Sequence, residues 1–238
     1  MADKILGVLG GLGPLATVYF MDLVVKMTDV QKDQDHISMI VLNHAAIPDR
    51  TEFILDNTKP NPLPVMIEDA KKLQAAGADY VVMPCNTAHF FYEQIQKNIG
   101  IPMLNIIEET VKHALKNSSD IKKLGILATK GTISAGAYQN MCGKYGLDCV
   151  IPSVSDEESL MNIIYNQVKA GKKADIDEFL KIIEHMKADG CDAVILGCTE
   201  LSIINKDFEL HRADIIDSLE VLAERSIELC GKKRKENF

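Results

Sequence analysis

Two stretches of the sequence repeat one pattern and constrain the fold more than any other feature. Residues 77–89 read GADYVVMPCNTAH, and residues 190–202 read GCDAVILGCTELS. Each begins with glycine, has Asp two positions later, continues with an apolar run, and reaches a cysteine eight positions after the glycine. Short apolar runs bounded by glycine are typical of buried parallel strands. Cys85 and Cys198 are therefore predicted to lie where a strand ends and a helix begins, at the edge where open α/β sheets bind ligands.

The segments around these two strands also recur. Residues 123–129 (KLGILAT) resemble residues 4–10 (KILGVLG), and the offset from Gly7 to Gly125 is 118 positions, close to the 113 positions between the two cysteines. Two features at nearly the same offset indicate an internal duplication. Predicted strands alternate with predicted helices along the chain, which favours parallel sheets. The strands are expected at residues 5–9, 36–43, 80–83, 102–105, 123–129, 148–151 and 191–197.

The predicted fold class is therefore α/β: two similar parallel-sheet domains related by a pseudo-twofold duplication, with the active site in the cleft between them. The first lobe is predicted to span residues 1–108 and the second residues 109–211, and the last helix, within residues 212–230, could return to the first lobe. The basic tail, residues 231–238, is expected to be a frayed end.

Composition excludes several classes of function. The chain is 47% hydrophobic and 25% charged, like an ordinary soluble globular protein, and its net charge of −8 provides no basic surface for nucleic acid or for an anionic membrane. No apolar run is long enough to span a membrane, and the N-terminus lacks a secretory signal. A cytoplasmic location is the default expectation, where cysteines stay reduced. The cysteine spacings match no common zinc pattern, so no metal site is predicted.

A pair of thiols facing one carbon suits a specific chemistry. One thiolate can remove a proton from one face of the carbon, and the other thiol can return a proton to the opposite face, which inverts the centre. Helix N-termini lower thiol pKa values, so both thiols are expected to be activated. Polar residues at the same turns, Asn86, Thr87 and Thr199, could stabilise charge on a substrate carboxylate.

The sequence resembles the aspartate/glutamate racemase superfamily, and within it the aspartate racemase branch, over nearly its whole length. Four motifs carry the resemblance: GGLGPLAT at 10–17, PCNTAH at 84–89, LATKGT at 127–132 and LGCTEL at 196–201. The resemblance implies two similar α/β domains and a racemase without cofactor that uses two cysteines as acid and base. It also implies a small acidic amino acid as substrate, and a homodimer, which is common in the family.

The resemblance also implies residues that hold the substrate. Relatives use an Arg in the Pro-Asp-Arg loop and a Lys before the second cysteine strand to contact the side-chain carboxylate. Arg50 matches the first and Lys169 the second, although Lys172 or Lys173 could be the residue meant. Cell-wall glutamate racemases carry His two positions after the second cysteine, where this chain has Glu200.

Further candidates follow the mirrored strands. Thr129 and Thr132 could contact the α-carboxylate or simply cap a turn, and Gly11 is a turn glycine that could line the cleft. His89 falls one turn into a helix and is assigned no catalytic role.

Three alternatives remain. The substrate could be glutamate, or the specificity could be broader. Residues 11–16 also fit a dinucleotide-binding glycine pattern, which would indicate a nicotinamide-dependent oxidoreductase, but the second strand ends in Leu42 and Asn43 without the acidic residue that binds ribose. A non-catalytic amino-acid-binding protein of the same fold would not need both thiols.

Overall fold

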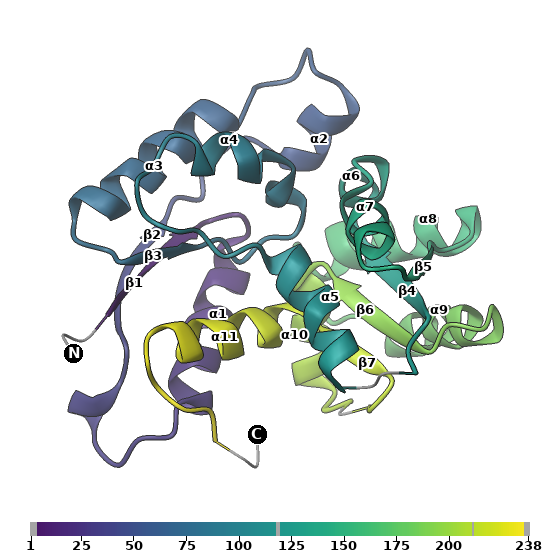
Figure 1. Ribbon diagram of the computed structural model, residues 1–238. Coiled ribbons are helices and arrows are strands. Elements are labelled where there is room, and N and C mark those ends of the chain that lie inside the picture. Colours follow the sequence, from purple (N-terminus) through teal and green to yellow (C-terminus); the bar gives the residue numbers. More distant parts are fainter. Residues whose placement is uncertain (1–3, 118–119, 211, 236–238) are drawn as a thin grey trace.

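The computed structural model describes residues 4–117, 120–210 and 212–235, and the chain forms two parallel sheets in two lobes (Figure 1). The first sheet has the strand order β2-β1-β3 and the second the order β5-β4-β6-β7. All of the pairings between these strands are parallel. The predicted fold class, with two parallel-sheet α/β lobes, is therefore confirmed.

The first lobe contains β1 (Ile5–Gly10), α1 (Pro14–Met27), β2 (Ser38–Asn43), α2 (Arg50–Leu55), α3 (Leu63–Ala75), β3 (Tyr80–Val82), the 3-10 turn η2 (Thr87–Phe91) and α4 (Tyr92–Gln96), with a short 3-10 turn η1 (Asp33–Asp35) before β2. The second contains β4 (Lys123–Ala128), α6 (Lys130–Ser134), α7 (Ala137–Lys144), β5 (Asp148–Val150), α8 (Val154–Asn162), the π-helix η3 (Ile163–Val168), α9 (Ile176–Ala188), β6 (Ala193–Gly197), α10 (Thr199–Asp207) and β7 (Ile215–Asp217). Two further helices, α5 (Ile106–Asn117) and α11 (Ser218–Leu229), join the lobes.

The register of the two sheets reproduces the repeat seen in the sequence. Gly7 of β1 pairs with Val81 of β3, and Gly125 of β4 pairs with Val194 of β6. In each case the partner lies four residues before the cysteine, since 85 − 81 and 198 − 194 are both four. The two cysteines therefore follow equivalent positions in the two sheets.

The lobes share one aliphatic core around α11. This helix packs against α1 of the first lobe and against α5 (Figure 1), and its Leu219 and Leu222 lie in the same buried cluster as Leu6 and Leu124 of the two sheets. The second sheet also continues past the predicted boundary at residue 211, because β7 pairs with β6.

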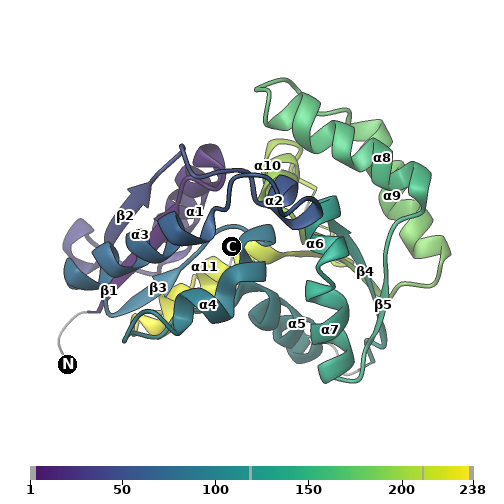
Figure 2. The ribbon, with the colours of Figure 1, turned by 90° about the horizontal axis from the view of Figure 1, so that it is seen from above.

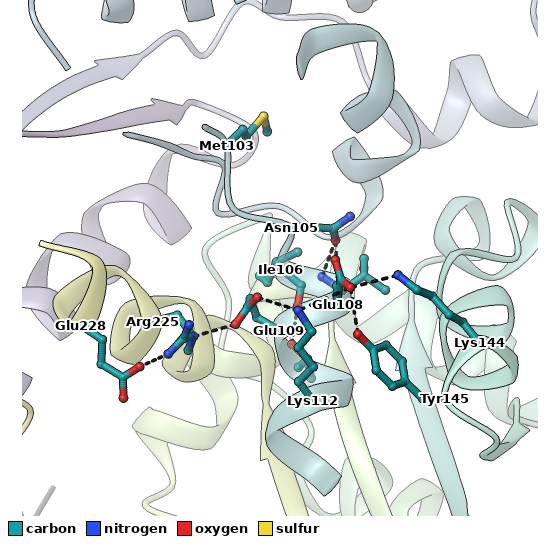
Figure 3. Close-up of polar contacts among 12 residues, drawn as sticks. Met103, Asn105, Ile106, Glu108, Glu109, Lys112, Lys144, Tyr145, Arg225 and Glu228 are labelled. Atoms are coloured by element: carbon teal, nitrogen blue, oxygen red, sulfur yellow. Dashed lines mark hydrogen bonds and ion pairs between the residues drawn. The ribbon is translucent and has the colours of Figure 1, made fainter. Parts of the chain in front are cut away.

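Helix α5 is attached by its charged residues to both of its neighbours. Glu108 accepts hydrogen bonds from the Lys144 ammonium at 3.0 Å and the Tyr145 hydroxyl at 2.9 Å, both at the end of α7 (Figure 3). Glu109 pairs with Arg225 of α11 at 2.6 Å, and Arg225 also pairs with Glu228. These contacts fix the connection between the lobes from two sides.

Two local predictions were wrong. Residues 102–105 form only a single bridge, Val81 with Met103, rather than a strand. Pro102 has no N–H to donate, and Asn105 already caps α5 by accepting from the Ile107 N–H at 3.0 Å.

The basic tail is also more ordered than expected as far as residue 235. The Lys233 carbonyl accepts from the Asp29 N–H, and the Lys235 N–H donates to the Met27 carbonyl, both at 2.8 Å, so the tail pairs with the end of α1. Residues 236–238 lie outside the described residues.

Two glycine substitutions should have opposite effects on stability. A Cβ at Gly197, the last residue of β6, would lie 2.9 Å from the Tyr138 ring and 3.2 Å from the Ala128 Cβ, whereas a Cβ at Gly143 in α7 would meet nothing within 4 Å. Overpacking predicts that Gly197→Ala lowers the free energy of unfolding by about 1–3 kcal/mol. Gly143→Ala should raise it by about 0.4–1 kcal/mol, because alanine restricts the unfolded chain. Urea unfolding of both variants measures the difference, and the same sign for both would contradict this packing.

Candidate active site

Both cysteines line one small cavity. Cys85 follows β3, and Cys198 is the N-cap of α10, directly after β6. Both side chains are buried, with 6% and 4% of the residue exposed. The cavity has a volume of about 270 Å³, and residues of both lobes line it. Among the other predicted residues it is lined by Arg50, Asn86, Thr87, Thr129, Lys169 and Thr199.

A wider cavity of about 890 Å³ contacts neither cysteine but adjoins the first. Gly11 lines this wider cavity only. The two cavities share four charged residues: Asp49, Arg50, Lys169 and Glu200. A small molecule that enters through the wider cavity would therefore pass these charges before it reaches the sulfurs.

The two thiols hold their protons more tightly than the sequence led us to expect. Burial raises the pKa of Cys85, and the Arg50 guanidinium and the Ala88 N–H only partly oppose it. Burial also raises the pKa of Cys198 well above its usual value, and the Glu200 carboxylate raises it further. The helix N-terminus is present at Cys198, but loss of solvation outweighs its effect.

Glu200 is in direct contact with the second thiol. The Cys198 Sγ donates a hydrogen bond to the Glu200 Oε2 at 2.9 Å, and the Thr199 hydroxyl donates to the same oxygen at 3.4 Å. Glu200 is itself buried. Sequence comparison with glutamate racemases marked the position as different but assigned it no role.

Arg50 is buried, and most of its guanidinium is already bound. Its Nη2 donates to the Leu12 carbonyl at 2.7 Å, and its Nη1 donates to the carbonyls of Pro48 and Ile47 at 3.0 and 3.3 Å. Only the buried Nε lacks a partner. A bidentate clamp on a carboxylate, which the planar fork suggested, would have to share the guanidinium with these three carbonyls. In this geometry Arg50 holds the glycine turn and contributes charge.

Lys169 is the lysine that reaches the cysteine cavity. Its ammonium lies 4.0 Å from the centre of the Tyr165 ring, a cation–π contact at the end of η3. Burial lowers the pKa of Lys169, but attraction to Glu200 and Cys198 outweighs this and leaves the pKa above its usual value. Lys172 and Lys173, the alternatives left open by the sequence, line a different cavity.

Threonine hydroxyls from both lobes meet beside the thiols. The Thr87 Oγ1 lies 2.8 Å from that of Thr129 and 2.9 Å from that of Thr132, and Thr51 donates to Thr129 at 3.4 Å. Thr129 also caps α6 by accepting from the Thr132 N–H. Thr132 does not line the cysteine cavity, so it supports the other hydroxyls from behind.

Asn86 links the first lobe to the second. Its Nδ2 donates to the Ser218 hydroxyl at 2.9 Å, and its Oδ1 accepts from the Tyr138 hydroxyl at 2.7 Å. Ser218 in turn donates to the Leu196 carbonyl at 2.7 Å, two residues before the second cysteine. Much of the hydrogen-bonding capacity of Asn86 is therefore used within the protein.

His89 fixes the backbone of the first cysteine. Its Nε2 accepts from the Ile106 N–H at 3.2 Å, and its Nδ1 donates to the Cys85 carbonyl at 2.8 Å. Burial lowers the pKa of His89 to about 4, so the ring is neutral near pH 7. The histidine holds the backbone of Cys85 and lines neither cavity.

Sequence reasoning missed several residues that line the cysteine cavity. Thr51 and Asp49 flank Arg50 in the same loop, and α2 of this loop lies against α6 of the other lobe (Figure 2). Leu12 lies in the glycine turn, and Tyr165 lies in a π-helical turn that the sequence did not indicate. Thr51 and Asp49 could have been identified because they are adjacent to Arg50 in the sequence, but nothing in the sequence indicated Tyr165.

Within residues 4–117, 120–210 and 212–235, no group of three or more His, Cys, Asp or Glu side chains could hold a metal ion. Over the same ranges, no helix has the length and apolarity that crossing a membrane requires.

Comparison with known proteins agrees with this geometry. The family model of the Asp/Glu/hydantoin racemases matches residues 9–225. The aspartate racemase of Picrophilus torridus superimposes with a TM-score of 0.84 at 33% identity, over 98% of this chain and 96% of that one. An aspartate racemase homologue of Pyrococcus horikoshii superimposes with a TM-score of 0.76 at 26% identity, over 96% and 99% of the two chains.

The broad specificity amino-acid racemase RacX of Bacillus subtilis is 28% identical over 93% of this chain and 96% of its own length. The glutamate racemase of Aquifex pyrophilus is 32% identical over 66% of this chain and 61% of its own length. The family match covers most of the chain, and the relatives described above are racemases or, in one case, a racemase homologue. The chain therefore belongs to the Asp/Glu/hydantoin racemase family, on its aspartate racemase branch, and is an isomerase of the racemase class.

Proposed function

We propose that the protein interconverts L- and D-aspartate by two-base proton transfer at the α-carbon, without a cofactor. The observation that carries the proposal is that Cys85 and Cys198, from equivalent places in two lobes, line one cavity together with Lys169, whose pKa lies above its usual value. The name of the Picrophilus relative favours aspartate over longer acids.

In the proposed reaction the α-carbon lies between the two sulfurs. The thiolate of one cysteine takes the α-proton, so the C–H bond breaks and an S–H bond forms. The thiol of the other cysteine donates its proton to the opposite face, so its S–H bond breaks and a C–H bond forms. The configuration inverts, and the protein returns to one thiol and one thiolate.

Other residues of the cavity bind the substrate in this proposal. Lys169 and the unpartnered Nε of Arg50 receive the side-chain carboxylate. Hydroxyls and backbone N–H groups at the two strand–helix turns receive the α-carboxylate and amine. The residues assigned to these groups are Asn86, Thr87, Thr129 and Thr199, with Thr132 behind them and Gly11 at the entrance.

Racemisation of glutamate, or of several acidic amino acids, is the alternative within the same chemistry. The Bacillus subtilis relative has broad specificity by name, and one methylene is worth only about 1–3 kcal/mol of discrimination in an apolar pocket. A cytoplasmic location remains a proposal that rests on the sequence alone.

Each cysteine should be necessary for inversion. Cys85→Ser and Cys198→Ser are each expected to lower the rate of racemisation by about 10²- to 10⁴-fold. A serine hydroxyl is a far weaker acid than a thiol, so it donates its proton less readily and hardly ionises to act as a base. Chiral chromatography and exchange of the α-proton in deuterated water measure the loss. Cys149→Ser, on β5 and away from the cavity, is the matched control. Full activity in either site variant would end the two-base scheme.

Lysine 169 should account for much of the binding of the side-chain carboxylate. A hydrogen bond to a charged group is worth about 1.5–3 kcal/mol, so Lys169→Gln should raise the KM for aspartate about 10- to 100-fold. Lys172→Gln, the same change three residues away and outside the cysteine cavity, should leave KM unchanged. Equal effects of the two substitutions would show that Lys169 acts only through the overall charge.

The substrate and the lack of a cofactor can be tested together. A panel of acidic and neutral amino acids, followed by polarimetry, should show aspartate racemised fastest. Activity should survive prior treatment with a metal chelator and with hydroxylamine, which removes pyridoxal. Loss of activity after either treatment, restored by the metal or by pyridoxal phosphate, would contradict the proposal. Faster turnover of glutamate would favour the alternative substrate.

We also propose a homodimer, as the family resemblance implies. Light scattering coupled to size-exclusion chromatography should then give twice the 26.3 kDa mass of one chain. A mass of one chain across the working range of concentration would contradict this.

A further inference from the structure

The two thiols occupy equivalent places in the fold but have different polar neighbours. The Cys198 Sγ donates to the Glu200 Oε2 at 2.9 Å. At Cys85 the Arg50 guanidinium and the Ala88 N–H favour a thiolate, and Glu200 opposes it less strongly. At Cys198 the Glu200 carboxylate acts more strongly than the Lys169 ammonium and the Glu200 N–H, which oppose it. The strongest charge acting on one sulfur is thus an anion, and the strongest acting on the other is a cation.

The hydrogen between Cys198 and Glu200 belongs to the sulfur. An ordinary carboxyl group is more acidic than an ordinary thiol by about four pKa units, so a single proton shared by the two rests on sulfur. A carboxylate that only accepts hydrogen bonds then requires a thiol as its donor.

From this contact we propose that Glu200 keeps Cys198 protonated, so that Cys85 is the first of the two cysteines to become a thiolate in the free protein. Glu200 is then a positioning residue: it acts through Cys198 and sets which sulfur is the base when substrate arrives. The inference deepens the proposed two-cysteine function and rests on it for its catalytic meaning.

The other charged and titratable groups at the site do not reverse this order. Lys169, directly after η3, attracts a thiolate at either sulfur and is also attracted to Glu200, and at Cys198 its effect is smaller than that of Glu200. Tyr165 of η3 and Asp49 of the loop before α2 also line the cavity, and both are neutral or negative, so neither favours a thiolate at Cys198. His89 contacts Cys85 only through the backbone carbonyl.

The test is the pH dependence of alkylation at each cysteine. The full-length protein is treated with iodoacetamide, which reacts with thiolates, and modification at Cys85 and Cys198 is followed by peptide mass spectrometry. Both residues are buried, so the absolute rate of each reaction also depends on how easily the reagent reaches the sulfur. The pH midpoint of each reaction reports ionisation. In the unaltered protein Cys85 is expected to react with a lower midpoint than Cys198.

Glu200→Gln separates the charge from the hydrogen bond. The amide oxygen of glutamine can still accept from a thiol, but the negative charge is gone. Modification of Cys198 below its midpoint should accelerate about tenfold for each unit by which the midpoint falls, and the gap between the two cysteines should narrow. The matched control is Glu184→Gln, which removes an exposed carboxylate of α9 in the same lobe and should leave both midpoints unchanged.

Two results would overturn the inference. The first is a midpoint for Cys198 equal to or lower than that for Cys85 in the unaltered protein. The second is an unchanged Cys198 midpoint in Glu200→Gln, which would leave the glutamate a purely structural role. Alkylation is measured on the free protein, so its outcome is independent of the racemisation assay: loss of the proposed function leaves the order of ionisation measurable, and the reverse is also true.

Discussion

The removal of two thiols from water is the constraint on which the rest of the site depends. A buried sulfur holds its proton more tightly than an exposed one, because the thiolate loses its solvation. Both cysteines show this shift, although both follow a strand and one caps a helix. A racemase that uses thiolates must offset this cost with charge. The guanidinium of Arg50 and the ammonium of Lys169 provide that charge, and both are themselves held by other groups of the protein.

In the proposed two-base reaction, holding two sulfurs about one carbon would also require lobes that keep their relative position. The buried bonds from Asn86 to Tyr138 and Ser218 join the turn after Cys85 to the second lobe. The threonine hydroxyls make a second connection, and the shared core around α11 makes a third. Small errors in placement are costly in proton transfer, so a stiff connection of this kind suits the chemistry.

The sequence predicted the parts of this structure that follow from short, regular patterns. Apolar runs ending in Cys85 and Cys198 fold as buried strands with matching registers, because burial and parallel pairing leave them few alternatives. The residues 102–105 show the limit of the method: an extended, apolar segment made one bridge only, since proline and a capping asparagine restricted it.

The side chains of the site were less predictable, because they depend on contacts between distant segments. Arg50 lies at the cavity as expected, but its bond to the Leu12 carbonyl depends on the glycine turn 38 residues earlier in the chain. Tyr165 lies in a π-helical turn, where one extra residue rotates the side chains away from the ordinary helical spacing. The direction of the thiol pKa shifts was also missed, since the depth of burial is a property of the assembled lobes.

The two cysteines have equivalent main-chain positions but different side-chain surroundings. Duplication places the two cysteines four residues beyond equivalent strand pairs, so the main chain treats them alike. An acidic amino acid is not symmetric, because its stereocentre carries a carboxylate and a second, longer acidic group. A site with the same side chains on both sides could not hold it in one orientation. The side chains around the two turns differ accordingly: Arg50 and Asn86 act at the turn after Cys85, whereas Glu200 and Lys169 act at the turn after Cys198. In the proposed reaction, the residues that orient the substrate also make the two thiols unequal acids, so orientation and proton order would arise from one set of residues.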